Sequence, residues 1–426
     1  MKILRASEFL TEWRIRNLQS VDLAIDQQVL AILQEVRKNG DAALKAYTNQ
    51  FDGVDIGSFI VTDEEIDEAY ANVSEAFLSS LVQAKQRIAT YHAEQKERSW
   101  FIQQSKGVML GQQVTPIERV GVYVPGGKAA YPSTVLMNVI PAKIAGVQHI
   151  AITTPPQADG SVNPAVLVAA REAGADIVYK VGGAQAIAAL AYGTETVEKV
   201  HKITGPGNAY VARAKKWVFG DVGIDMIAGP SEICVLADET ANPVYVAADL
   251  LSQAEHDEQA AAICVTTCKA FAGKLAGEVQ KQVKQMDRVQ IATKSIEDAG
   301  RIVVVESAQE AIDVVNEIAS EHLQIMVQNP MEILPFIRNA GAIFLGDYSP
   351  EALGDYVAGP NHTLPTSGTA VFASPLGVYD FMKKSSIIHY TKEAFEEVAD
   401  DIIVLAETER LSGHAQSIRV RKGERK

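Results

Sequence analysis

Near the start of the chain, hydrophobic positions recur with helical spacing. Between Ile25 and Tyr47 the apolar side chains fall three or four residues apart, which predicts an amphipathic helix that Gly40-Asp41 interrupts. A second helical region is predicted over residues 63–92, because the acidic run at its start is typical of a helix N-terminus. We therefore expect the N-terminal part to be helical.

From about Val114 the pattern changes to short apolar runs separated by glycine-rich turns and helical stretches. The recurring order of strand, turn and helix is typical of an open, mostly parallel sheet. The first series of predicted strands and helices covers 120–124, 134–144, 149–154, 163–173, 177–181 and 184–192. The second covers 233–237, 243–259, 262–266, 270–286, 301–306, 308–322, 323–327 and 342–345. These series predict an α/β fold with two tandem halves, followed by a helical tail after Tyr379.

Composition limits the kinds of partner. A chain of 426 residues with 47% hydrophobic residues is expected to form more than one well-buried domain. The formal net charge of −14 argues against nucleic acid or an anionic membrane as a partner. The three cysteines, Cys234, Cys264 and Cys268, fit neither a disulfide framework nor a zinc ribbon, and we interpret them as buried apolar residues. No secretion signal or membrane-length apolar segment is evident, so we expect a cytoplasmic protein.

Two segments together predict a metal site. In Gln253-Ala254-Glu255-His256 an amide and an imidazole lie three residues apart, so in a helix they share one face. Asp355, on a predicted Gly/Pro-rich loop, and the late His414 would complete a mixed set of oxygen and nitrogen ligands. Such a set without thiolate favours zinc, with manganese or cobalt as alternatives. The competing interpretation of Gln253 and His256 is a hydrated helix face.

Ser320-Glu321-His322 lies at the predicted junction between a helix and a strand. A carboxyl group and an imidazole can transfer protons near neutral pH. The competing interpretation is a histidine that stabilises a helix C-terminus.

Glycine- and proline-rich loops are a third candidate feature. Glycine allows a ligand to approach the backbone, and in open α/β sheets such loops gather beyond the carboxyl ends of the strands. The Gly-x-Gly-x-x-Gly dinucleotide pattern does not follow the first strand of this series, so nucleotide binding and ordinary tight turns both stay open. The loops are Pro125-Gly126-Gly127, Gly182-Gly183-Ala184-Gln185, Gly205-Pro206-Gly207-Asn208, Gly229-Pro230-Ser231-Glu232 and Gly359-Pro360-Asn361-His362.

Taken in order, these motifs resemble those of the histidinol dehydrogenase family over nearly the whole chain. Beyond the segments already named, the resemblance includes Gly40-Asp41-Ala42-Ala43-Leu44, Phe51-Asp52-Gly53, Val122-Tyr123-Val124, Ser133-Thr134-Val135-Leu136-Met137, Gly354-Asp355-Tyr356 and Gly413-His414-Ala415-Gln416-Ser417-Ile418. So many matches in one order are more specific than any single motif.

The resemblance implies a function and a set of roles. The family oxidises L-histidinol to L-histidine, the last step of histidine biosynthesis, in two NAD-dependent steps through an aldehyde. By resemblance, His322 is the general base and Glu321 activates the water that hydrates the aldehyde. The implied zinc ligands are Gln253, His256, Asp355 and His414; the same four residues with Ser231, His322, His362 and Glu409 form the substrate site; Tyr123, Gln185 and Asn208 contact NAD.

The resemblance also implies an architecture. We expect two Rossmann-like domains, each with an incomplete, open parallel sheet. Residues 20–118 and 232–376 would form the first, with the metal and catalytic residues, and residues 119–231 the second, with the NAD contacts. Helical extensions, residues 1–19 and 377–426, would serve dimerisation in an intertwined homodimer. Glu409 and His414 would then act on the partner's site.

Three other functions compete with this one. A homologous zinc- and NAD-dependent dehydrogenase for another small alcohol, such as a sulfonated diol, is the nearest, but the presence of Glu409 and His414 favours histidinol. A zinc hydrolase using His322 leaves the Tyr123, Gln185 and Asn208 matches without a reason. A non-catalytic binding protein gives no reason for Glu321-His322 beside a metal set.

Overall fold

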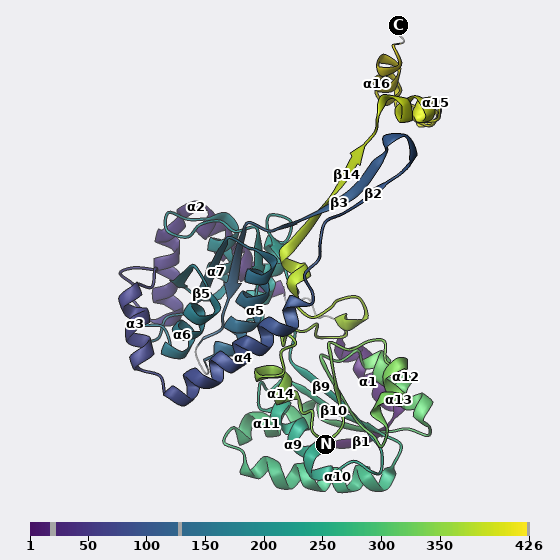
Figure 1. Ribbon diagram of the computed structural model, residues 1–426. Coiled ribbons are helices and arrows are strands. Elements are labelled where there is room, and N and C mark those ends of the chain that lie inside the picture. The colour runs from purple at the N-terminus through teal and green to yellow at the C-terminus, as the bar shows by residue number, and fades with distance from the viewer. Residues whose placement is uncertain (18–22, 127–129, 424–426) are drawn as a thin grey trace. The chain divides into compact units, whose positions relative to one another are not determined.

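The computed structural model describes residues 1–17, 23–126 and 130–423 (Figure 1). The chain forms two compact units. Unit 1 consists of Met1–Gln95 and Ile117–Phe381, and unit 2 consists of Lys96–Pro116 and Met382–Lys426. Unit 1 holds two parallel sheets, one of six strands and one of five. The predicted α/β fold with two parallel sheets is therefore confirmed.

The six-stranded sheet has the order β1-β11-β10-β9-β12-β13. Every residue of β9, β10 and β12 is buried, and such strands read as continuous apolar runs. Alternate residues of β9 enter opposite faces: Ile233 and Val235 pack with α9, α10 and α11, whereas Cys234 and Leu236 pack with α1 and α12 (Figure 1). The strands are β1 (Lys2–Arg5), β9 (Glu232–Ala237), β10 (Ala261–Thr266), β11 (Arg301–Val304), β12 (His322–Met326) and β13 (Ala342–Leu345), and the helices are α1 (Ala6–Asn17), α9 (Pro243–Ala254), α10 (Lys269–Gln282), α11 (Val289–Asp298), α12 (Ala308–Ile318), α13 (Pro330–Ile333) and α14 (Glu351–Tyr356).

The five-stranded sheet has the order β6-β5-β4-β7-β8. Its strands are β4 (Arg119–Tyr123), β5 (His149–Thr154), β6 (Ile177–Lys180), β7 (Lys202–Thr204) and β8 (Gly223–Ile224). One core joins this sheet to α2 (Leu23–Asp52), α7 (Gly183–Tyr192) and α8 (Ala209–Val218). The helices α5 (Pro132–Ala145) and α6 (Pro164–Ala173) pack on each other and on α4 (Glu75–Ala93), and α6 also packs on α3 (Asp63–Ala71).

Unit 2 is a small antiparallel sheet with two helices. The sheet has the order β14-β3-β2, from β2 (Trp100–Gln103), β3 (Met109–Pro116) and β14 (Met382–His389). The helices α15 (Lys392–Thr408) and α16 (Ser412–Lys422) pack through Ile403, Ala406, Ala415 and Ile418. The sequence predicted a helical tail after Tyr379, but it begins with β14. Strands β2 and β14 are largely exposed and β3 is mostly half-buried, so none of the three has the buried apolar run that marked the other strands.

Other differences from the predicted elements have local causes. The predicted helix over 63–92 is two helices, because Thr62 caps α3 with a capping box and Ser74 caps a new helix. The N-terminal segment was predicted to be helical, but Lys2–Arg5 pairs with β11 as a strand. The predicted helix at Ile25–Tyr47 is confirmed as α2, and Gly40 forms its kink with φ 49°.

The helices α2 and α3 pack on α7, α8 and α6 of the five-stranded half, which the sequence patterns did not show. The predicted domain boundaries themselves, and the homodimer, stay predictions. Among the described residues, no helix combines the length and apolar character needed to span a bilayer.

Candidate active site

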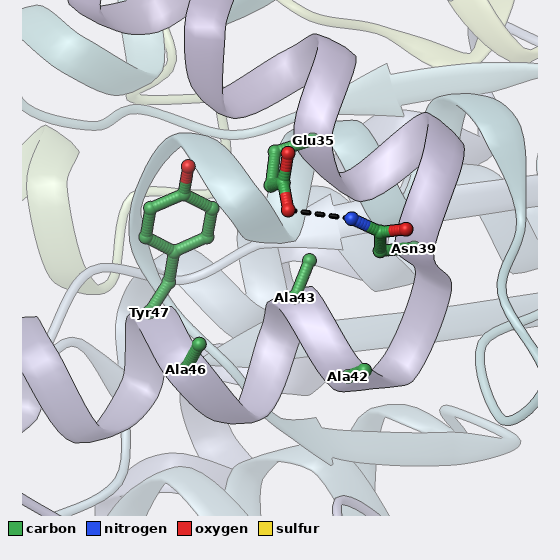
Figure 2. A pocket seen from close by; sticks show the side chains of 6 residues that line it. All are labelled: Glu35, Asn39, Ala42, Ala43, Ala46 and Tyr47. Carbon is green, nitrogen blue, oxygen red and sulfur yellow. Dashed lines mark hydrogen bonds between the residues drawn. The ribbon is translucent and has the colours of Figure 1, made fainter.

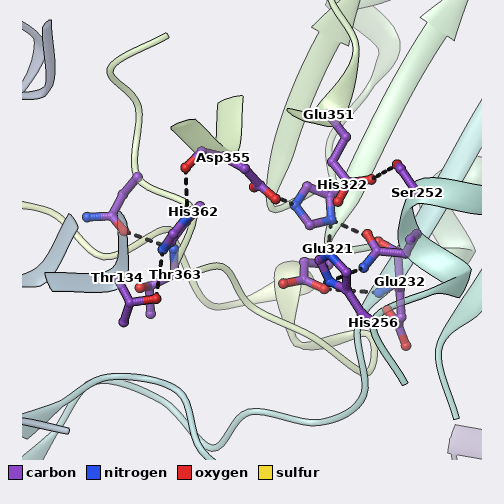
Figure 3. A network of polar contacts seen from close by, with 12 residues as sticks. Thr134, Glu232, Ser252, His256, Glu321, His322, Glu351, Asp355, His362 and Thr363 are labelled. Carbon is purple, nitrogen blue, oxygen red and sulfur yellow. Dashed lines mark hydrogen bonds and ion pairs between the residues drawn. The ribbon is translucent and has the colours of Figure 1, made fainter. Parts of the chain in front are cut away.

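Two polar residues begin neighbouring strands of the six-stranded sheet. Glu232 is the first residue of β9 and His322 the first of β12, and the parallel pairing places His322 beside Ile233. Both side chains therefore belong to the amino edge of this sheet (Figure 3). The helix predicted over 308–322 ends earlier, at Ile318, because Ala319 adopts a left-handed backbone with φ 48°. Glu321 and His322 thus enter the site from a turn into a strand, and the helix-terminal interpretation of His322 is wrong.

The surrounding backbone orients the His322 ring. Nδ1 lies 3.1 Å from the carbonyl oxygen of Glu232, an acceptor, so Nδ1 carries the proton. The other ring nitrogen, Nε2, is buried without a hydrogen-bond partner among the described residues and lies 3.8 Å from Oδ1 of Asp355. Burial lowers the pKa of His322 and so favours the neutral imidazole. The geometry leaves Nε2 as a proton acceptor.

Glu321 is held beside this imidazole. Its Oε2 accepts a hydrogen bond from the backbone N–H of Glu232 at 3.0 Å and lies 3.8 Å from Nδ1 of His322. Burial raises the pKa of Glu321 well above its ordinary value, and the charges of Glu232, Glu351 and Asp355 raise it further. One residue, Glu232, therefore positions both predicted catalytic side chains through its backbone. Burial raises the pKa of the Glu232 carboxyl group itself to about 7.

The predicted metal ligands of unit 1 come together at the same edge. Oxygen and nitrogen atoms of His256, Glu351 and Asp355 all lie within 4.8 Å of one another. The sequence placed Asp355 on a loop, but it lies in α14, where the four-residue spacing puts Glu351 on the same helix face. Glu351 was not among the predicted metal ligands, although its four-residue spacing from Asp355 could have indicated it. Burial and the charge of Asp355 raise the pKa of Glu351 well above its ordinary value.

The side-chain amide of Gln253 lies next to both His256 and Glu351 of this cluster. The sequence predicted His256 in the same helix, but α9 ends at Ala254 and His256 follows in the next turn. The amide nitrogen of Gln253 is 3.3 Å from Nδ1 of His256, and its oxygen faces the carboxylate of Glu351. With the amide turned the other way, its nitrogen donates to the Glu351 carboxylate, so the donor set of His256, Glu351 and Asp355, rather than the orientation of Gln253, indicates a cation. In the described part of the chain, no Lys or Arg pairs with Glu351 or Asp355, so the donor set fits a divalent cation.

The other predicted substrate contacts are placed differently from one another. His362 lies next to the cluster, with Nδ1 3.0 Å from the backbone oxygen of Asp355 and Nε2 3.4 Å from Oγ1 of Thr134 (Figure 3). Ser231 precedes β9, and its carbonyl oxygen accepts from the N–H of Ala261. Glu409 follows α15 and His414 lies in α16, both in unit 2, so their participation stays a prediction.

The predicted dinucleotide contacts lie at the carboxyl edge of the five-stranded sheet. Tyr123 ends β4, Gln185 lies in α7 after β6, and Asn208 caps α8 after β7, so all three follow carboxyl ends of strands. The Tyr123 hydroxyl accepts from the N–H of Gly183 at 3.1 Å, and burial raises the pKa of Tyr123 to about 12. The side-chain oxygen of Gln185 is buried without a partner in the described chain.

A groove on α2 offers no comparable chemistry. Its lining residues, among them Glu35, Asn39 and Tyr47, follow the inner side of the kinked helix (Figure 2). Glu35 accepts a hydrogen bond from Asn39, and none of the predicted site residues lines this groove.

Comparison with known proteins gives one consistent result. The family model described as histidinol dehydrogenase matches residues 15–422. A histidinol dehydrogenase of Oceanobacillus iheyensis is 56% identical over 408 residues, which cover 96% of this chain and 94% of that protein. That of Bacillus subtilis is 55% identical, with 96% of each chain covered. The crystal structure of histidinol dehydrogenase from Elizabethkingia anophelis superposes with a TM-score of 0.91 at 39% identity, covering 97% of this chain and 96% of that one.

Proposed function

This chain belongs to the histidinol dehydrogenase family, and from this premise we propose that it oxidises L-histidinol to L-histidine with two molecules of NAD. The observation that carries the mechanism is the orientation of His322. Its Nδ1–H donates to the carbonyl oxygen of Glu232, so only Nε2 can accept a proton. That nitrogen faces the cation-binding cluster rather than another protein donor.

In the first step, Nε2 of His322 accepts the hydroxyl proton of the alcohol while a hydride leaves the same carbon for NAD. The products are an aldehyde, one NADH and one proton. A neutral imidazole is required at the start, and burial of His322 favours that form. The carbonyl of Glu232 then stabilises the imidazolium that forms, because it holds Nδ1–H.

In the second step, water adds to the aldehyde and the resulting hydrate gives a second hydride to NAD. Its products are the acid, a second NADH and a second proton. We assign Glu321 to remove a proton from that water in its ionised form. The N–H of Glu232 donates to Oε2 at 3.0 Å and favours ionisation, and the raised pKa makes the ionised carboxylate a stronger base. A thiol route has no support. Cys234 and Cys264 are buried in the sheet, where burial raises the pKa of both thiols, and the sulfur of Cys268 caps α10 by accepting from the N–H of Phe271.

The proposed cation is Zn²⁺, held by Gln253, His256 and Asp355 together with His414. Zinc has no redox chemistry of its own, so when bound it would anchor and orient the substrate. We place Glu409 and His414 in the site of a partner subunit, as the family resemblance implies. Ser231 and His362 would contact the substrate, and Tyr123, Gln185 and Asn208 would contact NAD.

The test is the amount of NADH formed per L-histidinol consumed, with the metal present, removed by a chelator and restored. Two NADH per substrate, lost on chelation and regained with zinc, is the expected result. One NADH with aldehyde released would contradict the role of Glu321. No NADH would contradict the proposed substrate, and other small alcohols would then be assayed.

A further inference from the structure

Two charged side chains are buried together in the five-stranded half of unit 1. Lys215 of α8 and Asp225, which follows β8, form an ion pair whose side chains are 2% and 1% exposed. Removing two charges from water is costly, and a buried pair is stable only when further hydrogen bonds satisfy both partners. The remaining hydrogen bonds of this pair therefore show what it is built to hold.

Those hydrogen bonds converge on one glycine. Nζ of Lys215 donates to the carbonyl oxygen of Gly205 at 2.8 Å. Oδ2 of Asp225 accepts from the N–H of the same glycine, also at 2.8 Å. The second carboxylate oxygen, Oδ1, accepts from the N–H of Met226 at 2.6 Å. Both polar groups of the Gly205 backbone are thus held by a single ion pair.

Gly205 occupies a position that tolerates little movement. It follows β7 with φ +108°, and a Cβ there would clash with the carbonyl oxygen of Tyr123. The backbone of Gly205 therefore packs directly on Tyr123, where another residue would not fit. Gly205 also begins the loop Gly205-Pro206-Gly207-Asn208 that leads into α8.

The far end of this loop is held by a helix cap. Oδ1 of Asn208 accepts from the N–H of Val211 at 3.1 Å, which leaves the amide nitrogen of Asn208 outside the cap. The ion pair and the cap together set how Asn208 lies relative to Tyr123. Both residues are contacts of the proposed dinucleotide site.

We infer that Lys215 and Asp225 are positioning residues for the dinucleotide. The inference rests on the proposed function, because it takes Tyr123 and Asn208 as NAD contacts. The pair touches no proposed ligand group itself and acts through the backbone of Gly205. Displacing a binding loop by about 1 Å can cost up to a hundredfold in enzyme efficiency.

The main test is Asp225→Asn, measured by initial rates with NAD and with L-histidinol varied in turn, and by direct titration with NAD. The amide retains an acceptor for Gly205 but removes the partner of Lys215. We expect the KM and Kd for NAD to rise by about tenfold or more, while the KM for L-histidinol stays unchanged. A purely structural role would lower the melting temperature without this selective change.

Two further variants keep the test decisive. Lys215→Met with Asp225→Asn removes both charges, so it leaves no unpaired buried charge and is expected to fold even if the single variant does not. Its KM for NAD should stay raised. Lys202→Met is the matched control. Lys202 begins β7, the strand that Gly205 follows, and pairs with Asp380 at the end of β7 away from Gly205. It should change stability but not the KM for NAD.

The outcomes separate this inference from the proposed function. If the unmodified enzyme forms no NADH from L-histidinol, the proposed function is wrong. If it forms NADH and the double variant keeps the normal KM and Kd for NAD, the positioning role is wrong while the proposed function stands. An equal rise in the KM for both substrates would also contradict it.

Discussion

The two parallel sheets carry a glutamate and a histidine at equivalent places, yet only one pair is buried. At the amino edge of the five-stranded sheet, Glu118 precedes β4 and His149 begins β5, and both are exposed. At the amino edge of the six-stranded sheet, Glu232 and His322 occupy the equivalent places by register, and both are buried beside Glu321 and α14. The comparison shows that residue type and edge position do not make a site; burial and directed backbone contacts do.

The two sheets also use opposite edges for the proposed ligands. Tyr123, Gln185 and Asn208 follow the general rule, since they lie beyond carboxyl ends of strands. Glu232 and His322 lie at amino ends. The carboxyl edge offers neutral groups over a satisfied ion pair. At the amino edge, no Lys or Arg among the described residues forms an ion pair with Glu351 or Asp355, and their basic neighbours are histidines. The first suits a preorganised dinucleotide site, and the second suits a cation and a cationic substrate.

The largest expected effect comes from His322→Asn. Loss of the proton acceptor should lower kcat for histidinol oxidation by about 10²–10⁴-fold. Zinc content and the Kd for NAD should stay unchanged, because neither depends on Nε2. His149→Asn, at the equivalent place in the other sheet, is the control and should retain full activity. Retained turnover in His322→Asn would contradict the assignment of the base.

Glu321→Gln tests whether the buried carboxyl group serves the second step. The amide cannot take a proton from water, so oxidation of the aldehyde should slow by about a hundredfold, more than oxidation of the alcohol. Single-turnover rates with L-histidinol and with the aldehyde separate the two steps. Glu118→Gln changes an exposed glutamate at the amino edge of the other sheet and should alter neither step. An equal loss in both steps would argue against water activation.

Glu351→Gln tests the residue that the sequence analysis missed. Removing one carboxylate charge from the cluster of His256, Glu351 and Asp355 should weaken zinc binding by about ten- to a hundredfold. Competition with a chromophoric chelator measures this affinity directly. The exposed Glu332→Gln should bind zinc normally. Unchanged zinc affinity in Glu351→Gln would place that carboxylate outside the cation site.

The smallest signal comes from mixing His414→Ala chains with His322→Asn chains. If His414 acts on the partner's site, each mixed dimer has one intact site out of two, so random mixing should restore about a quarter of normal activity. Neither variant alone should be active. Mixed dimers that are verified by mass and remain inactive would show that His414 serves its own subunit.

Local pattern was sufficient for the interior strands and for most helices. Strands β9, β10 and β12 are buried on both faces and therefore appear in the sequence as apolar runs. The predicted interruption of the first helix at Gly40 is the kink of α2. The exposed strands β2 and β14 were not predicted, because without a buried face their residues show no apolar pattern. The residue types of the site were recognisable in the sequence. By spacing alone, each motif could also be explained by a non-functional feature, such as a hydrated helix face, a helix-terminal histidine or a tight turn.

By itself, the sequence determined the α/β class, the parallel strands and, through resemblance, the family. Tertiary structure decided that Glu232 holds Glu321 and His322, that Glu351 joins His256 and Asp355, and that Lys215 and Asp225 meet at Gly205. The physical reason is the separation along the chain between the residues that make each contact. Burial of a strand affects consecutive residues and is therefore visible in the sequence. Except for Glu351 and Asp355, which are four residues apart in α14, these contacts join residues ten or more positions apart, and the pairing and register of the sheets bring them together.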